Sequence, residues 1–251
     1  MIKPADYKDE EARLEELASY SIMDSLPEED YDYLTSIAGQ ICDTPIALVS
    51  LLDDKRQWFK SSHGLDATET PKEYAFCAHA IHHPQELFVV ADSRKDERFH
   101  DNPLVTGGPN VVFYAGMPLV SNKGLPMGTL CVIDNKPKQQ GLSESQENAL
   151  KSLARQVMNL MNLRKRQNQL ETALEDLSQM NNDLERFATT VLDDGQSPLI
   201  NINRATKFLV LDRDIRQHSF RKKMVDSILD SSEKLKLMFE EYKNQNKSTN
   251  R

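Results

Sequence analysis

Residues 45–65 read PIALVSLLDDKRQWFKSSHGL, and this stretch decides the expected fold. Residues 45–52 are almost entirely apolar and have the length of a strand. The charged residues 53–56 supply a turn, and residues 57–62 return as a second strand. The stretch therefore predicts a β-hairpin, which is the start of an antiparallel sheet.

More elements of the same kind follow on both sides of this hairpin. Upstream, residues 27–42 begin with proline and acidic residues, as the N-terminus of a helix prefers. Downstream, two apolar runs are joined by SNKG at residues 121–124, which is a typical turn sequence. The expected helices cover residues 10–20, 27–42 and 76–82, and the expected strands cover residues 45–52, 57–62, 87–91, 111–120 and 127–134. The sequence thus predicts an α+β fold, in which helices flank an antiparallel sheet.

Prolines and glycines divide the chain in two. Of the 11 prolines and 9 glycines, only Gly195 and Pro198 lie beyond Gly141. Residues 142 to about 191 contain neither type and place apolar side chains at alternating steps of three and four residues. This is heptad spacing, with which two long helices wind around each other. We therefore expect one long helix here and a domain boundary near residue 142.

The heptad pattern also predicts the partner of this helix. With Leu170, Leu177 and Leu184 at d positions, Asn181 falls at an a position. A buried amide at that position pairs with its symmetry mate and fixes the register of a parallel dimer. The seam begins with Leu150, Leu153, Val157 and Leu160, and continues after a three-residue discontinuity with Leu163, Leu170, Leu174, Leu177, Asn181, Leu184, Ala188 and Val191. The prediction is a homodimer, whose helices either transmit a signal or form a passive stalk.

The composition disfavours several classes of protein. The formal net charge of −8 argues against a nucleic-acid groove. The 3 cysteines form no CxxC pair, which argues against both a disulfide framework and a zinc site. The N-terminal residues lack the apolar segment of a signal peptide, and no apolar run approaches the length of about 18 residues that a membrane span needs. We expect a cytoplasmic protein that binds neither nucleic acid nor membrane.

Four stretches occur in an order that one family shows. They are residues 45–65, FCAHAI at 76–81, DERFHDNPLV at 96–105 and FYAGMPLVSNKGLPMGTLCVID at 113–134. These blocks resemble bacterial GAF sensor domains, and the resemblance covers about residues 9–160. It implies a cavity between the sheet and the loops that follow Gly64 and Ala91, which in such domains can hold a small molecule. The ligands of the family include cyclic nucleotides, haem and bilins, so the cofactor stays unknown.

Five polar or reactive side chains are candidates for this cavity: Cys77, His79, Asp92, Tyr114 and Cys131. Cys77 and His79 are two residues apart, which on a helix points them about 200° apart, so they do not share one metal ion. Bilin-binding relatives carry a cysteine directly followed by a histidine, whereas an alanine intervenes here. Cys131 alternates with apolar neighbours on a strand and is interpreted as a small buried hydrophobe. We expect neither a metal site nor a covalently attached chromophore.

Two other functions are left open beside signalling. One branch of the GAF family reduces free methionine sulfoxide with cysteine thiols, so an enzyme built on the GAF pocket is the alternative function. A truncated product without any output is a third interpretation. The quoted blocks resemble sensor domains rather than the reductase branch, and the prediction is that this chain is not an enzyme.

A second resemblance begins where the heptads end. Residues 184–202, LERFATTVLDDGQSPLINI, resemble the first helix of the dimerisation and phosphotransfer domain of sensor histidine kinases. In that family the phosphate-accepting histidine is followed by an acid and, five residues after the histidine, by proline. Counting back from Pro198 places Asp193 at the histidine position and Asp194 at the acid position. The resemblance therefore implies a degenerate phosphoacceptor position, because a carboxylate cannot form a phosphohistidine.

The remaining residues complete the expected architecture. Apolar residues recur at helical spacing from about 219 to 243, and the polar residues 211–216 form the connection of a helical hairpin. Two such hairpins in a dimer would make a four-helix bundle, without an ATP-binding domain. The predicted division is a GAF domain at 1–141, a coiled coil at 142–183, a histidine-kinase-like hairpin at 184–246 and a disordered tail at 247–251.

These features predict a cytoplasmic, non-catalytic signal-transduction protein of a two-component system. Ligand binding or partner binding at the GAF domain would alter the coiled coil. The hairpin, a pseudokinase bundle, would then bind a response regulator or a true histidine kinase. The identity of the ligand, the identity of the output partner and the direction of regulation do not follow from the sequence.

Overall fold

The computed structural model describes residues 1–211 and 218–249, and it leaves the side chains of residues 191–193, 211, 218 and 241–249 undescribed. It contains two compact units, Met1–Gln169 and Leu170–Arg251. We describe each unit by itself. The first unit holds the sheet, and the second consists of helices.

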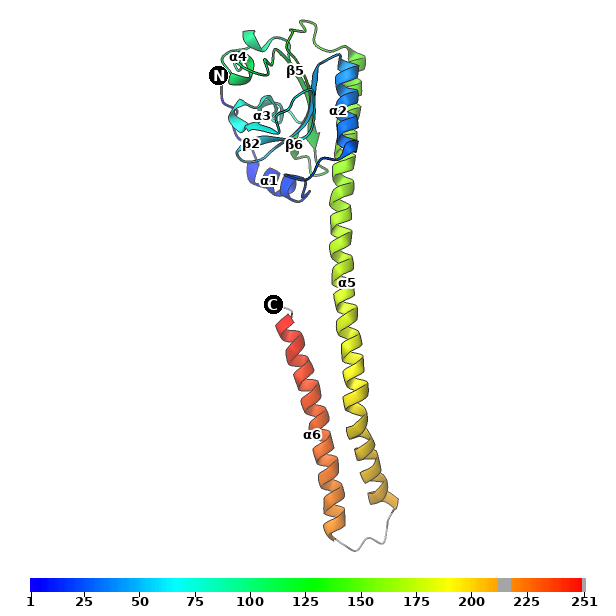
Figure 1. The fold of residues 1–251 in the computed structure, drawn as a ribbon. Coiled ribbons are helices and arrows are strands. Elements are labelled where there is room, and N and C mark those ends of the chain that lie inside the picture. Colours follow the sequence, from blue (N-terminus) through cyan, green and yellow to red (C-terminus); the bar gives the residue numbers. More distant parts are fainter. Residues whose placement is uncertain (212–217, 250–251) are drawn as a thin grey trace. The chain divides into compact units, whose positions relative to one another are not determined.

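The first unit is built on one six-stranded sheet with the strand order β3-β2-β1-β6-β5-β4 (Figure 1). Every neighbouring pair of these strands is antiparallel. The strands are β1 (Ile46–Leu52), β2 (Arg56–His63), β3 (Glu69–Pro71), β4 (Phe88–Val90), β5 (Phe113–Val120) and β6 (Pro126–Asp134). The expected strands are thus all present, and β3 is an additional edge strand that the polar sequence after Gly64 did not indicate.

Local chemistry explains the two hairpins of the sheet. In the β1–β2 turn, the Asp53 carboxylate accepts hydrogen bonds from the backbone N–H groups of Lys55 (2.8 Å) and Arg56 (2.7 Å). In the β5–β6 turn, the backbone N–H of Gly124 donates to the carbonyl oxygen of Ser121 (2.9 Å). At Gly128 a Cβ atom would lie only 2.0 Å from the Ser50 carbonyl oxygen of β1, so the close pairing of β1 with β6 requires glycine.

Helices cover both faces of the sheet (Figure 1). The helices α2 (Glu29–Cys42) and the first part of α5 (Glu144–Leu211) lie on one face, and α3 (Phe76–Ala80) and α4 (Pro103–Thr106) lie on the other. The helix α1 (Glu10–Ala18) and two short 3₁₀ turns, η1 (Lys72–Tyr74) and η2 (Ser93–Lys95), complete the unit. The sheet therefore separates two hydrophobic cores.

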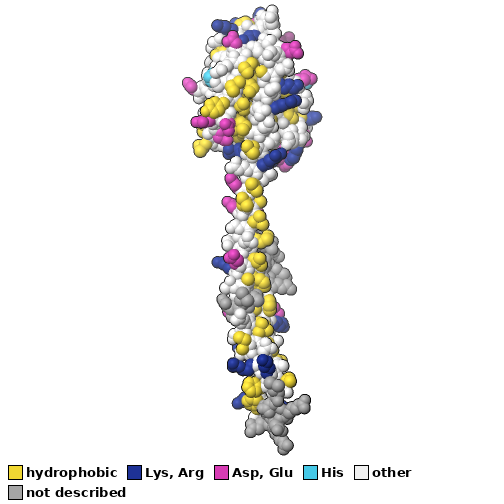
Figure 2. Space-filling model, turned by 90° about the vertical axis from the view of Figure 1, so that its right-hand side faces the viewer, with side chains coloured by type: hydrophobic (Ala, Val, Ile, Leu, Met, Phe, Trp, Pro, Cys, Tyr) yellow, Lys and Arg dark blue, Asp and Glu magenta, His cyan; other side chains and the backbone are white. Residues whose placement is uncertain are grey.

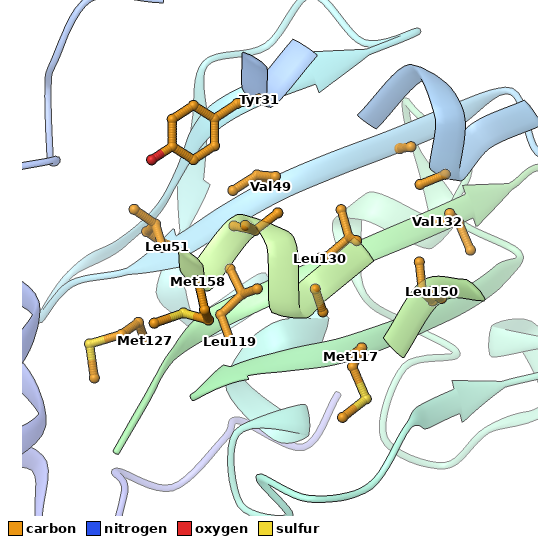
Figure 3. Close-up of a cluster of buried hydrophobic side chains, with 14 of the residues drawn as sticks. Tyr31, Val49, Leu51, Met117, Leu119, Met127, Leu130, Val132, Leu150 and Met158 are labelled. Atoms are coloured by element: carbon orange, nitrogen blue, oxygen red, sulfur yellow. The ribbon is translucent and has the colours of Figure 1, made fainter. Parts of the chain in front are cut away.

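The larger core lies between the sheet and the pair α2 and α5. Figure 3 shows Tyr31 from α2, Val49 and Leu51 from β1, and Leu150 and Met158 from α5 pointing into it. Each of these side chains is less than a tenth exposed. Burial of a large apolar side chain contributes about 1.5–3 kcal/mol, so α5 is fixed to the domain over its first turns.

The second unit contains the rest of α5 and the helix α6 (His218–Thr249), which form a helical hairpin. The Phe208 and Phe220 rings meet edge to face, with centroids 6.3 Å apart. Ala205 and Ser231 are buried. The helix α5 passes through residue 184 and through Pro198 without interruption, and α6 extends to Thr249, so residues 247–249 are helical rather than part of a disordered tail. The division of the chain into four segments stays a prediction.

Candidate functional site

A cavity of about 520 Å³ opens on the face of the sheet that is opposite to α2 and α5. Leu48 of β1, Phe59 of β2 and Tyr114 of β5 form its floor. The loop that follows Gly64 and the segment from Leu104 to Val111 form its walls. The cavity thus lies where the resemblance to GAF domains implied one, between the sheet and the loops after Gly64 and Ala91.

Strand alternation decides which residues of β2 reach the cavity. Successive side chains of a strand point to opposite faces. Gln57 and Phe59 line the cavity, whereas Trp58 lies in the core under α2 and the Lys60 ammonium contacts the residues just before α2. The strand β2 therefore contributes side chains both to the cavity floor and to the opposite face of the sheet.

The lining of the cavity is mainly apolar and aromatic. Phe59, Phe76 and Tyr114 contribute rings, and the Phe76 and Tyr114 rings stack with centroids 5.1 Å apart. The polar lining side chains are Gln57, Asp66 and Thr70, and the Thr70 hydroxyl donates to Gln57 Oε1 at 3.3 Å. Among the described lining residues there is no lysine, arginine or histidine. The cavity therefore favours an apolar ligand and offers no cation to a phosphate group.

Of the five candidate site residues, Tyr114 alone is among the residues that line this cavity. Cys77 and Cys131 are fully buried and are not among the lining residues, and both are free thiols. The hydroxyl group of Tyr114 forms a hydrogen bond of 3.1 Å with the Thr129 hydroxyl. Burial raises the pKa of the Cys77 thiol to about 12 and that of Cys131 to about 11. Both thiols are thus protonated at neutral pH, which makes them poor nucleophiles.

His79 and Asp92 make contacts that stabilise the fold, and neither lines the cavity. The His79 ring lies edge-on to Phe99, with centroids 4.9 Å apart. Burial, and then the nearby Arg98 guanidinium, lower the pKa of His79 to about 4. The Asp92 carboxylate caps η2 and accepts hydrogen bonds of 2.8 and 2.9 Å from the Arg94 guanidinium. The structure therefore does not gather the five candidates into one site.

Metal binding and membrane insertion can be judged over the described part of the chain. No group of three or more His, Cys, Asp and Glu side chains there is arranged to hold a metal ion. None of the helices described is both long and apolar enough to cross a membrane. The expected absence of a metal and of a chromophore stays a prediction.

Sequence reasoning missed the residues that form most of the cavity. It selected side chains with reactive groups, whereas the cavity is lined by Leu48, Phe59, Phe76, Leu104 and Val111. The available signal was the alternation along β2, which places Gln57 and Phe59 on one face. The loops that close the cavity are set by tertiary packing and leave no period in the sequence.

The predicted dimer seam is exposed only in its later part. Leu150 and Val157, at its start, are fully buried in the larger core, so these two side chains pack within one chain. Beyond the sheet, its leucines Leu163, Leu170, Leu174, Leu177 and Leu184 are 57–63% exposed. Figure 2 shows yellow hydrophobic side chains following one another along this helix. Asn181 is also exposed, and the Val191 side chain is outside the described ones.

The phosphoacceptor positions can be placed only in part. Asp193 belongs to α5, but its side chain lies outside the described residues. Asp194 is exposed, and Pro198 is half-buried within the helix. These positions therefore neither support nor oppose the resemblance to a histidine kinase.

Comparison with known proteins identifies the class. The model of the GAF domain family matches residues 27–161, which is more than half of the chain, so this protein belongs to the GAF domain family. The resemblance noted from the sequence is confirmed for this domain, and so is the α+β fold. The family match ends at residue 161, and the histidine-kinase-like hairpin stays a prediction.

One curated relative is the cyclic di-GMP phosphodiesterase PA2567 of Pseudomonas aeruginosa strain PAO1, which is 41% identical over 158 residues. The match covers 63% of this chain, and this chain spans about a quarter (27%) of the relative's length. This finding contradicts the prediction that the chain is not an enzyme, because the relative is named as one. The prediction rested on the resemblance of the quoted blocks to sensor domains rather than to the reductase branch, and such a resemblance does not exclude an activity.

Two solved structures with similar folds are GAF domains. The GAF domain of an Acinetobacter phosphoenolpyruvate-protein phosphotransferase is 20% identical, with a TM-score of 0.44, and the match covers 62% of this chain and 93% of that one. The blue-light-absorbing form of the Thermosynechococcus elongatus PixJ GAF domain is 16% identical, with a TM-score of 0.46, and the match covers 67% of this chain and 96% of that one. Similarity at this level says nothing about ligand or activity.

Proposed function

We propose that this GAF-domain signalling protein senses a small, largely apolar molecule that carries no phosphate group, and that it passes the signal to a dimeric coiled coil. The observation that carries this proposal is the cavity of about 520 Å³ with its aromatic and aliphatic lining. A ligand that fills such a cavity gains about 25 cal/mol for each Å² of apolar surface removed from water. An anionic nucleotide would find no cationic partner among the described lining residues.

A fluorescent probe tests the cavity directly. N-phenyl-1-naphthylamine is neutral, apolar and small, and its emission rises when it leaves water. We expect saturable binding to the unmodified chain. Ala67→Trp should abolish this binding, because Ala67 lies in the exposed loop at the wall of the cavity and an indole there would obstruct it. Ala18→Trp, at an exposed position of α1, is the matched control. Equal binding by both variants would show that the probe binds elsewhere and would refute the proposal.

The output of the protein is proposed to depend on a second copy of the chain. The exposed leucines of α5 support this step, because heptad leucines are stable when the seam of another helix covers them. The hairpin of α5 and α6 is proposed as the surface that binds a response regulator or a true histidine kinase. Its supporting feature is the sequence pattern around Asp194 and Pro198.

The relative supports a second candidate function. The relative is named a cyclic di-GMP phosphodiesterase, and about a quarter (27%) of its length matches this chain at 41% identity. We propose that this chain acts in second-messenger signalling of the same kind. Incubation of the purified chain with cyclic di-GMP, followed by chromatography of the linear dinucleotide, measures whether it also hydrolyses this nucleotide.

A further inference from the structure

One carboxylate oxygen joins three elements of the first unit. Glu28 immediately precedes α2, and its Oε1 accepts a hydrogen bond from Lys60 Nζ of β2 at 2.6 Å. The same oxygen accepts a hydrogen bond from Arg164 Nη1 of α5, also at 2.6 Å. Lys60 lies in the strand that lines the cavity, whereas Arg164 follows Met161, the last residue of α5 in the larger core.

The Lys60 end of this bridge is fixed. Its side chain is fully buried, and its ammonium also donates to Ser25 Oγ (2.8 Å) and to the Leu26 carbonyl oxygen (2.6 Å). It lies 5.2 Å from the centroid of the Tyr31 ring. A buried ammonium needs its counter-ion, because an unpaired charge away from water is costly. Glu28 is thereby held in place, and the position of its carboxylate follows that of β2.

The Arg164 end belongs to a group of contacts between α5 and the segment from α1 to α2. Arg164 Nε also donates to the Ser21 carbonyl oxygen at 3.2 Å. One residue further, Lys165 pairs with the buried Glu16 carboxylate at 3.2 Å. The Tyr20 hydroxyl donates to Asn162 Oδ1 at 3.1 Å. Three residues within one turn of α5, Asn162, Arg164 and Lys165, are thus attached to the same N-terminal segment.

The alternation of β2 connects this bridge with the cavity. Phe59 forms part of the cavity floor, and the next residue, Lys60, points to the opposite face of the sheet, where it contacts Glu28. We infer that Glu28 couples the floor of the ligand cavity to α5, so that a displacement of β2 by a ligand is passed through Lys60 and Glu28 to Arg164. This inference rests on the proposed sensing function and names the residues that would regulate its output.

Hydrogen exchange of the backbone amides in residues 158–169 tests the attachment of α5. Arg164→Gln removes the α5 end of the bridge and leaves the buried pair of Lys60 and Glu28 intact, so the domain should fold. We expect exchange in this segment to become about three- to fivefold faster, as loss of a partly exposed ion pair predicts. Arg166→Gln removes the same charge from an exposed position of the same helix and should leave exchange unchanged. Equal exchange in both variants would overturn the inference.

A double-mutant cycle tests the connection to the cavity. Phe59→Leu replaces the ring in the cavity floor with a smaller apolar side chain and adds no charge. Its effect on hydrogen exchange in residues 158–169 is measured twice, once with arginine and once with glutamine at position 164. We expect the effect to be present with Arg164 and to vanish with Arg164→Gln. An equal effect in both backgrounds would refute the coupling. The cycle uses no ligand, so failure of the naphthylamine probe to bind would count against the proposed sensing function alone.

Discussion

His79 is a residue whose surroundings favour its neutral form. Burial and the Arg98 guanidinium lower its pKa from 6.5 to about 4, and its ring packs against Phe99. His82 and Asp96 are the other titratable groups near it. In the unfolded chain the imidazole regains its ordinary pKa of 6.5. Between pH 4 and pH 6.5 the unfolded state therefore binds more protons than the folded state. The contribution of His79 to stability is therefore complete above pH 6.5 and declines as the pH falls towards 4.

This dependence gives a prediction for the folding of the first unit. His79→Gln removes the titration, so the free energy of unfolding should fall less between pH 7 and pH 5 than it does in the unmodified chain. The difference should be on the order of 1 kcal/mol, because the side chain is half-buried and solvent screens part of the effect. Urea unfolding followed by tryptophan fluorescence at both pH values measures it. His83→Gln, at an exposed position, is the control and should keep the full pH dependence.

At the scale of single elements, α5 carries the most direct prediction. Leu177 and Leu184 are 57% and 60% exposed in a single copy, and both occupy d positions of the seam. Replacing both with lysine should convert the proposed homodimer into a monomer, because each buried leucine contributes about 1.5–3 kcal/mol and a charge in the seam opposes association. Multi-angle light scattering at tens of micromolar measures the mass.

The control for this change is placed on the outer side of the same helix. Glu175→Lys and Asn182→Lys fall at b positions of the heptads and should leave the dimer intact. A monomeric mass near 28.6 kDa for the unmodified chain would contradict the homodimer and, with it, the transmission of a signal through paired helices.

At the scale of the whole molecule, the two units differ in what stabilises them. The first has two cores on either side of the sheet. Among the described side chains from Leu170 onward, buried positions are confined to Gly195, Ala205 and Ser231. A helical hairpin with so little buried apolar surface needs association for stability, so we expect the second unit to depend on the proposed homodimer.

Thermal unfolding should therefore show two transitions by circular dichroism at 222 nm. The first, with the loss of helix in the second unit, should move to higher temperature as the protein concentration is raised. The second, followed by the fluorescence of Trp58 in the larger core, should be independent of concentration. A single transition in both signals would show that the two units unfold together and would contradict the separate origin of their stability.

The sequence by itself determined the longer elements and their type, because these depend on short-range periodicity, whereas the short elements β3 and α4 were not indicated. The expected strand at residues 57–62 is β2 (Arg56–His63), and the absence of proline and glycine after residue 141 was sufficient to indicate the long helix. The heptad leucines could also be identified from the sequence, because a repeat of seven residues is a local pattern within one helix. The family resemblance over the first unit was contained in the same local blocks.

Only the tertiary structure decided which side chains meet. Tyr114 lines the cavity, whereas Cys77 and Cys131 are buried away from its lining and Asp92 pairs with Arg94. The reason is that loop packing, rather than residue chemistry, determines which side chains line a cavity. Glu28 is 32 positions from Lys60 and 136 positions from Arg164 in the sequence, yet its carboxylate contacts both. No local pattern encodes such a contact. It arises because the sheet brings β2, the start of α2 and the outgoing part of α5 to one place, where a buried ammonium requires a carboxylate.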